Sequence, residues 1–485
     1  MVEHSFDLVA AARQEMIEEG FDPDFPPEVE RQLAALKVKT GPAPQPGVRD
    51  LRSLLWSSID DDTSRDLDQA EVAERVSGGT RILIGIADVD SDVQIGSPID
   101  KHAAVQTTSV YTGVRTFPML PEQLSTDLTS LNEGKDRLAV VVEVVVTGDG
   151  SVNSGDVYCA LVRNQVQLTY SAVGAWLEGS APAPPKVKSS DELAAQLKLQ
   201  DETAQNFFQE RQRLGALTID RVEAEAIFSD GEVKGIAARR KNRASELIEN
   251  FMIAANGVMA STLTRAGVSF IRRVVRTPER WPRIVELAAQ HGQKLPAEPD
   301  SRALNLFLQT MRTVDAIHYA DISLAVVKLM GPGEYVLSRP GDPDQVHFAL
   351  AAHDYTHFTA PNRRFADTVT QRLIKSILGK QPPPYSDQEL DSIARNCTLK
   401  EDAARKVERS MNKRIAAVAL QHRIGQSFAA VVTGVTPKGV FVRISDPPAE
   451  GLLVRGQETV DVGDQIQVKL ISTDISRGYL DFAKY

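Results

Sequence analysis

The strongest constraint on the fold is a nearly unbroken apolar run at residues 138–146, in which valine predominates. A shorter run of the same kind occupies residues 83–86. β-branched residues favour strands, and a run with almost no polar interruption is typical of a strand buried within a sheet. We therefore expect buried strands of a sheet in the first third of the chain.

Helical patterns dominate the segment that follows. A proline-rich break at residues 181–185 precedes the first long helix, where Ser189 and Glu192 fit a capping box with Ser189 at the N-cap. Helices are predicted at residues 191–213, 243–266, 282–291, 301–311, 362–379 and 387–423. The centre of the chain is thus expected to be large and of mixed α and β structure.

The two ends differ from this centre. A helix is predicted at residues 7–19 and another from Pro27 to residue 36, before a Gly- and Pro-rich linker at residues 41–47. Apolar alternation predicts a small β-barrel at the other end, with strands at residues 428–435, 439–444, 451–454 and 465–471. The expected domains are a small helical unit resembling a helix-turn-helix (1–48), a large unit (49–425) and a barrel (426–485).

Composition narrows the class of protein. The chain has two cysteines, Cys159 and Cys397, which excludes a disulfide framework and a multi-cysteine zinc site. The N-terminus lacks the basic and apolar regions of a signal peptide, and no apolar run is long enough to span a bilayer. We therefore predict a cytoplasmic protein with no membrane partner. The net charge of −10 argues against nucleic-acid binding, because contacts with phosphates need Lys and Arg. However, two locally basic stretches occur near residues 272–283 and 405–423.

The segment at residues 58–69 is the first candidate site. Five aspartates fall within nine residues, at positions 60, 61, 62, 66 and 68. Carboxylates this close repel one another and raise each other's pKa unless cations neutralise them. Oxygen ligands of this kind suit Mg²⁺, Mn²⁺ or Ca²⁺, and they do not suit zinc or copper.

Three interpretations of this segment compete. It could be a solvated polar loop, or a two-metal phosphodiesterase site in which carboxylates hold adjacent ions. It also matches part of a calcium-binding EF-hand loop, but Arg65 stands where the sharp turn needs glycine and a strand pattern follows, so we reject that reading. The EF-hand match uses Asp60, Asp62, Ser64 and Glu71. Taken alone, the segment leaves the loop and the metal site evenly balanced.

A second candidate segment runs from residue 355 to residue 367. It places Arg363 and Arg364 in tandem at the start of a predicted helix, where guanidinium groups and free backbone N–H donors together form an anion site. His353 and His357 have a spacing that could bind zinc, but no third ligand is in view, so we interpret them as packing or hydrogen-bonding residues.

Both segments resemble the RNase II, or RNB-domain, family of exoribonucleases. The family's acidic motif, I-D-x5-D-x-D-D, is matched from Ile59 onward, except that Gln69 replaces the last acid. The family's arginine motif, Y-T-H-F-T-S-P-I-R-R-Y-A-D, is matched at residues 355–367 except at positions 360, 362 and 365. Other blocks match in the correct order over residues 49–425, and the C-terminal segment resembles an RNA-binding OB-fold named after a ribosomal protein.

The resemblance implies a mixed α/β catalytic domain followed by a five-stranded OB-fold barrel. It implies processive 3′→5′ hydrolysis of single-stranded RNA to 5′-mononucleotides, with Mg²⁺, or alternatively Mn²⁺, as the cofactor. The implied metal ligands are Asp60, Asp66, Asp68 and Gln69, and the three aspartates with Arg363 are the implied catalytic residues. The implied RNA-binding residues are Tyr111, Phe270, Tyr355, Arg364 and Glu408, with Tyr111 and Phe270 stacking on bases and Glu408 orienting Arg363.

Two departures from the family pattern affect these expectations. Gln69 removes one negative charge, so metal affinity is expected to be lower unless Asp61 or Asp62 compensates. The family usually carries two cold-shock barrels at the N-terminus, and 48 residues cannot hold one. Because Gln69 weakens the metal site, the alternative function is a catalytically impaired RNB-domain protein that grips RNA without cutting it.

Overall fold

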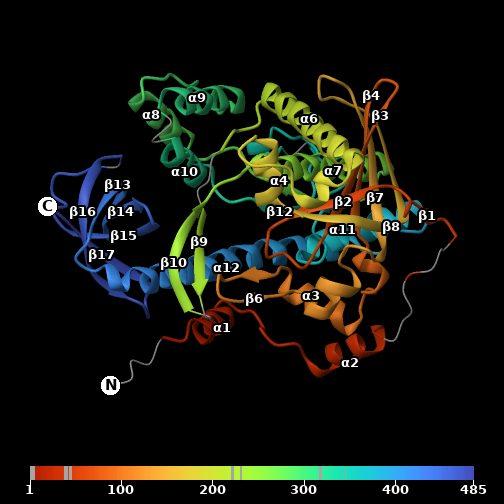
Figure 1. The fold of residues 1–485 in the computed structure, drawn as a ribbon, viewed down its shortest axis with the longest axis horizontal. Helices are drawn as coiled ribbons and strands as arrows, with labels where there is room; N and C mark the ends of the chain where they lie inside the picture. Colours follow the sequence, from red (N-terminus) through yellow and green to blue (C-terminus); the bar gives the residue numbers. More distant parts are fainter. Residues whose placement is uncertain are drawn as a thin grey trace.

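The computed structural model describes residues 6–37, 42, 46–219, 223–229, 232–315, 319–343, 346–461 and 463–485. The predicted linker at residues 41–47 lies mostly outside the described residues. Figure 1 shows a mixed sheet and its helices forming the bulk of the molecule, with a small barrel at the C-terminal end. No helix in the described ranges is both long and apolar enough to pass through a bilayer.

A six-stranded sheet forms the centre of the molecule, in the order β1-β8-β2-β3-β4-β7. Its strands are β1 (Arg49–Asp50), β2 (Trp56–Asp60), β3 (Gln69–Val76), β4 (Gly79–Ala87), β7 (Asp136–Val146) and β8 (Val152–Thr169). The two apolar runs lie within β4 and β7, which confirms them as buried strands. The 18-residue strand β8 pairs first with β7 and then with β2, so it joins both ends of the sheet.

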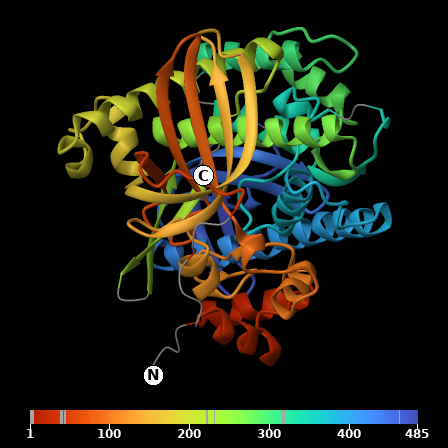
Figure 2. The same ribbon diagram turned by 90° about the vertical axis from the view of Figure 1, so that its right-hand side faces the viewer.

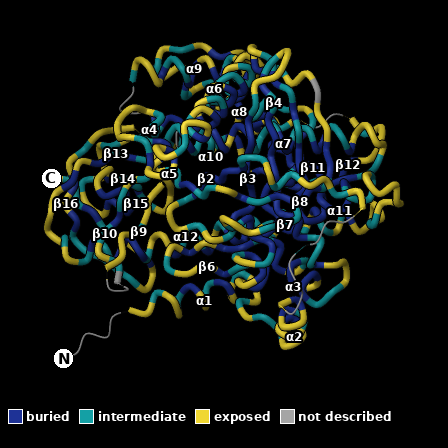
Figure 3. Tube along the Cα trace, turned by 45° about the vertical axis from the view of Figure 1, so that its right-hand side comes forward, coloured by how far each residue is buried: buried dark blue, intermediate teal, exposed yellow. Residues whose placement is uncertain are grey.

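Helices cover one face of this sheet and form the largest hydrophobic core with it. The core takes apolar side chains from α6 (Asp191–Leu214), α7 (Arg243–Ala266) and α11 (Phe365–Leu378). A second core, with Trp56 and Leu67, lies on the opposite face. Figure 2 shows the strands in front of these helices, and Figure 3 shows that the centre is buried while the outer helices are exposed.

Several shorter elements surround the sheet. They include β5 (Val110–Tyr111), β6 (Thr116–Phe117), α3 (Pro98–Gln106), α4 (Tyr170–Leu177) and α5 (Pro185–Lys188). The helices α8 (Trp281–Gln290), α9 (Ser301–Val314) and α10 (Tyr319–Met330) share a separate small core. Two antiparallel strand pairs complete this region: β9 (Glu223–Ser229) with β10 (Glu232–Arg239), and β11 (Phe270–Val274) with β12 (Glu334–Ser338). The sequence analysis did not predict α10.

The N-terminal helix α1 and the C-terminal barrel both contact α12 (Asp387–Leu420). The helices α1 (Leu8–Glu18) and α2 (Pro27–Leu36) form where they were predicted, and Met16 of α1 packs against Val407 of α12. The predicted barrel is confirmed as a closed sheet in the order β13-β14-β15-β17-β16. Its strands are β13 (Ser427–Thr436), β14 (Gly439–Ser445), β15 (Pro448–Arg455), β16 (Gln465–Asp474) and β17 (Tyr479–Lys484).

Two predicted helix starts were wrong. The N-cap of α6 is Ser190, whose side chain accepts a hydrogen bond from the N–H of Leu193, because Ser189 ends the short helix α5. The helix predicted from residue 362 begins at Phe365. The preceding residues form tight turns instead, in which the N–H groups of Arg363 and Arg364 donate to the carbonyl of Ala360.

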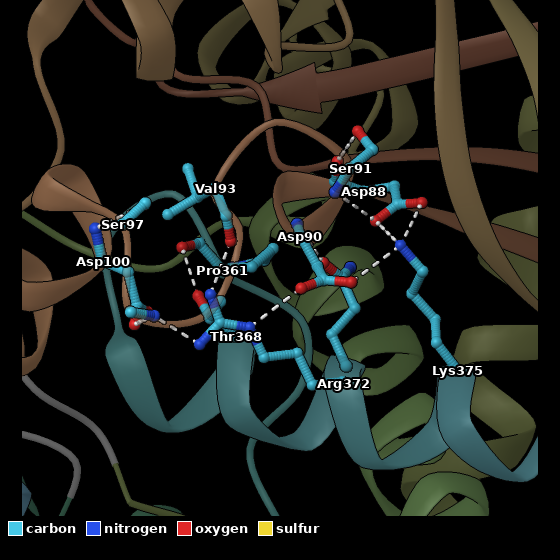
Figure 4. Close-up of polar contacts among 12 residues, drawn as sticks. Asp88, Asp90, Ser91, Val93, Ser97, Asp100, Pro361, Thr368, Arg372 and Lys375 are labelled. Atoms are coloured by element: carbon cyan, nitrogen blue, oxygen red, sulfur yellow. Dashed lines mark hydrogen bonds and ion pairs between the residues drawn. The ribbon is translucent and has the colours of Figure 1, made fainter. Parts of the chain in front are cut away.

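A buried ionic network locks α11 against the end of β4 (Figure 4). Arg372 of α11 has 1% of its side chain exposed and contacts Asp90 at 2.9 Å and Asp100 at 2.7 Å. One turn on, Lys375 lies 2.9 Å from Asp88 and 2.9 Å from Asp90. Because each charge has partners of opposite sign, the network fixes the position of α11 and of the loop that precedes it.

Replacing Arg372 with methionine tests this role. The change leaves Asp100 without its buried cation and Asp90 with Lys375 alone, so we expect a loss of about 3–5 kcal/mol in the free energy of unfolding. Arg395→Met is the matched control, because its pair with Asp391 is on the surface, with 76% of the Arg395 side chain exposed, and should cost no more than about 0.5 kcal/mol. Urea unfolding measures both. Equal losses in the two variants would contradict the structural role of the network.

Candidate active site

The acidic loop connects the end of β2 to the start of β3. Asp60 is the last residue of β2 and is 8% exposed, and Asp68 precedes β3 and is 2% exposed. Between them, Leu67 is fully buried and its N–H donates to Ser130 Oγ at 2.9 Å, which anchors the loop. Asp66 is more exposed, and its charge acts on both other aspartates. Asp66 thus lies within electrostatic range of both Asp60 and Asp68.

Burial perturbs the two inner carboxyl groups strongly. It raises the pKa of Asp60 to about 7, against the lowering effects of a hydrogen bond from Gln69 and the charge of Arg363. It also raises the pKa of Asp68 to about 7, again opposed by Arg363 and reinforced by Asp66. Such carboxylates need a positive charge nearby to remain ionised near neutral pH.

The donor chemistry fits a divalent cation that prefers oxygen. Asp60 Oδ2 is buried and has no hydrogen-bond partner among the described residues, so it is free to accept an ion. Across those same residues, no three acidic, histidine or cysteine side chains stand together as a preformed metal site. The other carboxylate oxygens are held by protein donors: Asp60 Oδ1 by Gln69 and Asp68 by the arginine loop.

Gln69 was predicted to offer its amide oxygen to a metal. In the structure its Nε2 donates to Asp60 Oδ1 at 2.9 Å. The amide therefore acts on the site through Asp60, because its hydrogen bond favours the ionised form of that carboxyl and lowers its pKa.

The arginine loop at residues 355–367 meets the acidic loop at Asp68. The N–H of Asn362 donates to Asp68 Oδ1 at 3.1 Å, and Arg363 Nε lies 3.5 Å from Asp68 Oδ2. The Arg363 side chain is 49% exposed, so its guanidinium reaches both the carboxylate and solvent. Burial alone would lower the pKa of Arg363, but Tyr111 and Asp68 raise it, so the group carries a positive charge.

Two residues predicted to contact RNA support this loop from within. Arg364 makes a two-point contact with Asp367, at 2.8 and 2.6 Å, and Asp367 also accepts from the N–H of Ala360. Tyr355 is 6% exposed, and its hydroxyl accepts a hydrogen bond from Asn256 at 3.1 Å. The RNA contact expected of Tyr355 is corrected accordingly, because its side chain is buried in the protein. The side chain of Arg364 is 27% exposed, so its RNA contact stays a prediction.

His357 belongs to the same supporting layer. Its Nδ1 lies 2.8 Å from the hydroxyl of Tyr335, and its ring packs edge-on against Tyr355 and Tyr335. Burial holds the pKa of His357 well below its usual range, so the ring is neutral. His353 contributes its carbonyl, which accepts from Arg272 at 3.1 Å.

Tyr111 lies at the opening of the site. It is 41% exposed, and its hydroxyl lies 3.4 Å from Asp66 Oδ2. Glu408 of α12 was expected to orient Arg363, but its carboxylate accepts from the backbone N–H of Tyr111 at 3.2 Å. Glu408 therefore positions the aromatic residue, and the contact expected with Arg363 is corrected.

Phe270 does not lie opposite Tyr111. It belongs to β11, is 2% exposed and packs inside the largest core. A ring buried to this degree cannot stack on a base, so the prediction that Phe270 pairs with Tyr111 across the RNA was wrong. The physical reason is that all five residues of β11 are buried, so neither face of this strand opens to solvent.

A cavity of about 660 Å³ opens beside the acidic loop. It is lined by the loop residues Asp61 and Asp62 and by a basic stretch, Arg239 to Lys241. Asp61 forms an ion pair with Arg239, and Asp62 accepts from Ser171 Oγ at 2.6 Å. These two aspartates therefore face the cavity and are engaged with protein partners.

The sequence analysis missed several residues that build the site. Asn362 and Asp367 lie inside the arginine motif, but only the fold shows that they hold Asp68 and Arg364. Glu71 is fully buried, and burial together with the charge of Asp60 raises its pKa well above its usual range. Its one sequence signal was its place in the rejected EF-hand pattern.

Comparison with known families matches two parts of the chain. Residues 48–380 match the RNB domain, and residues 426–484 match the RNase II-type exonuclease C-terminal S1 domain. The first match covers more than half of the chain and includes both the acidic loop and the arginine loop.

Similar proteins named Ribonuclease R occur in several bacteria. The protein of Thermotoga maritima is 29% identical over 95% of this chain and 68% of its own length. That of Escherichia coli is 28% identical over 95% of this chain and 60% of its own length. The chain thus spans about three fifths to two thirds of the length of these relatives.

Solved structures show the same fold. RNase R of Mycoplasma genitalium in complex with ribose-methylated single-stranded RNA has a TM-score of 0.89 at 24% identity, covering 99% of this chain and 78% of that one. Yeast Ssd1, described as a pseudonuclease, has a TM-score of 0.72 at 17% identity, covering 96% and 57%. On the match over residues 48–380, this chain belongs to the RNB-domain family.

Proposed function

We propose that the protein is a hydrolytic exoribonuclease that degrades single-stranded RNA processively from its 3′ end and releases 5′-mononucleotides. The observation that carries this proposal is the contact of Asp68 with both Asn362 and Arg363, which sets an arginine beside a cluster of buried carboxylates. Family membership and relatives named Ribonuclease R support it.

Divalent metal dependence follows from the family, and we propose Mg²⁺ as the ion, with Mn²⁺ as an alternative. Asp60, Asp66 and Asp68 would hold it, since Asp60 Oδ2 is unpartnered and buried carboxylates gain most from a nearby cation. When bound, divalent ions in such sites generate hydroxide near neutral pH and stabilise charge on the attacking and leaving oxygens.

The protein's own groups position the substrate. Arg363 is charged and half exposed, so it can contact a phosphate while Asp68 holds its guanidinium in place. Tyr111 offers an exposed ring beside Asp66 for stacking on a terminal base, and Glu408 fixes its backbone.

A further feature suits single-stranded RNA. The C-terminal barrel belongs to a class that binds single strands through backbone contacts and base stacking. We also propose a cytoplasmic location, in keeping with two free cysteines.

The alternative is an RNA-binding protein that does not cut. The fold alone does not exclude it, because a protein described as a pseudonuclease has the same fold. The intact contact between Asp68 and the arginine loop favours catalysis over this alternative, since a protein that only grips RNA needs no buried carboxylates near the phosphates.

The variant Asp68→Asn separates cutting from binding. It keeps the shape of the side chain but removes the charge that faces Arg363, so we expect the single-turnover rate to fall at least about a hundredfold. RNA affinity should hold or rise, because a negative charge near the phosphates is gone. Single-turnover cleavage of 5′-labelled RNA measures the rate, and filter binding measures the affinity. EDTA is expected to abolish cleavage by the parent protein.

The control for this variant is Asp391→Asn, which removes a surface carboxylate of α12 that pairs with Arg395. It should leave both quantities unchanged. Cleavage by Asp68→Asn at the parent rate, or full activity after exhaustive chelation, would show that the metal-dependent model is wrong.

Tyr111→Ala tests base stacking at the opening. Loss of the ring should weaken binding of short RNA by about 1–3 kcal/mol. Tyr111→Phe keeps the ring and removes only the hydroxyl near Asp66, so its affinity should stay close to that of the parent. Fluorescence anisotropy with a labelled pentanucleotide measures both. An equal loss in the two variants would point to the hydroxyl and not to stacking.

A further inference from the structure

The junction segment, residues 129–132, forms hydrogen bonds with both the acidic loop and the arginine loop. It precedes β7, and its first residues are buried, with Thr129 at 4% exposed and Ser130 at 0%. It belongs to neither of the two motifs that mark the candidate site in the sequence. A buried segment that bonds to two loops can fix the position of one loop relative to the other.

The second residue of the junction segment holds the acidic loop. Ser130 Oγ accepts from the N–H of Leu67 at 2.9 Å and lies 3.0 Å from the carbonyl oxygen of Arg65. The N–H of Leu131 donates to the carbonyl of Leu67 at 2.9 Å. These contacts hold the residues on both sides of Asp66, so the middle of the acidic loop is fastened to the junction segment.

The first residue of the segment holds the arginine loop. Thr129 Oγ1 lies 2.6 Å from Asn362 Oδ1 and 2.9 Å from the carbonyl oxygen of Leu124. Asn362 is 1% exposed, and Thr129 is the one hydrogen-bond partner of its side chain among the described residues. The N–H of Asn362 donates to Asp68 Oδ1 at 3.1 Å. Asn362 therefore joins Thr129 through its side chain and Asp68 through its backbone.

This contact is a feature of this chain and not of the family motif. The motif has isoleucine at the position of Asn362, and an isoleucine side chain cannot form a hydrogen bond. A buried amide is costly when it lacks partners, and the Nδ2 of Asn362 has none among the described residues. The remaining bond to Thr129 therefore decides where this amide, and the N–H beside it, comes to rest.

The residues that follow Asn362 have a separate support. The N–H of Ser109 donates to the carbonyl of Arg363 at 3.0 Å, and the N–H of Phe365 donates to the carbonyl of Thr107 at 2.8 Å. These bonds hold the backbone beyond position 362 but do not reach the Asn362 side chain. Loss of the Thr129 contact should therefore displace the start of the arginine loop without unfolding it.

We propose that Thr129 is a positioning residue for RNA cleavage, which acts through Asn362 to hold the arginine loop against Asp68. Ser130 holds the acidic loop from the same segment, so the two residues together fix Arg363 relative to the aspartates. The inference rests on the proposed exoribonuclease function and deepens it, because it names a residue outside both motifs on which the geometry of the site depends.

Thr129→Val in the full chain tests the proposal, because it keeps the shape of the side chain and removes the hydroxyl. We expect the single-turnover rate at saturating RNA and Mg²⁺ to fall at least about tenfold, since small displacements of reacting groups are costly. RNA affinity in filter binding should change less than about twofold, because no charge that contacts phosphate is altered. Thr129→Ser retains the hydroxyl and should cleave within about threefold of the parent rate.

Thr203→Val is the matched control. Thr203 of α6 is 2% exposed, and its hydroxyl donates to the carbonyl of Leu199 at 2.8 Å, so the same chemical change is made in a buried helix. This variant should cleave like the parent. An equal loss of rate in Thr203→Val and Thr129→Val would show a general effect of removing a buried hydroxyl, and the inference would be wrong.

Asn362→Ala removes the same contact from the side of the loop. It should also slow cleavage at least about tenfold, and adding Thr129→Val to it should lower the rate less than about threefold further, because the partner is already absent. A tenfold loss from Thr129→Val in both backgrounds would mean that Thr129 acts by another route. Should Thr129→Val not fold, Asn362→Ala alone still decides, since cleavage at the parent rate would overturn the proposal.

Amide hydrogen exchange measures the position of the loop without using activity. In Thr129→Val the N–H groups of residues 362–365 should exchange faster, while those of residues 65–68 keep the parent rate because Ser130 is unchanged. If the parent protein does not cleave RNA, the proposed function fails, and this difference in exchange still tests the junction. If the parent cleaves RNA but Thr129→Val matches it in both rate and exchange, the proposed function stands and the inference fails.

Discussion

Asp68 joins two loops that lie 294 positions apart, and the candidate site depends on that contact. One loop leaves the sheet after β2, and the other ends at the first turn of α11. Neither holds its position alone, because both lack regular backbone pairing over several residues. Leu67 anchors the first loop, and Asp367 closes the second on itself through Ala360 and Arg364. The meeting point is therefore fixed from both sides.

The buried network on α11 extends this constraint to the whole core. Arg372 and Lys375 are held by three aspartates that follow β4 or belong to α3, so the helix cannot shift along the sheet without separating buried charges. Because Arg363 lies in the loop directly before α11, fixing the helix also fixes the position of Arg363. The molecule thus uses fully paired charges for architecture and keeps an incompletely paired one, Asp60, in the acidic loop.

Sequence patterns located some parts of the site better than others. Asp60, Asp66, Asp68 and Arg363 stay predictions, and they could be named because they lie in short motifs that resemble those of the family and such motifs are visible in the sequence. Phe270 and Glu408 were misjudged, because their roles depend on which way a side chain points after strands and helices have packed. Tyr355 and Arg364 show the same difficulty, since a motif does not tell a residue that touches substrate from one that supports its neighbour.

By itself the sequence determined the two buried strands, most of the helices and the C-terminal barrel, because these follow from local periodicity and composition, and it marked the two candidate-site segments through motifs that resemble those of the family. Only the tertiary structure decided that the acidic and arginine loops meet at Asp68, that Arg364 faces Asp367, and that Glu71 is buried without a hydrogen-bond partner among the described residues. These facts arise from contacts between residues far apart in the chain, and local patterns carry no information on which distant side chains share one buried space.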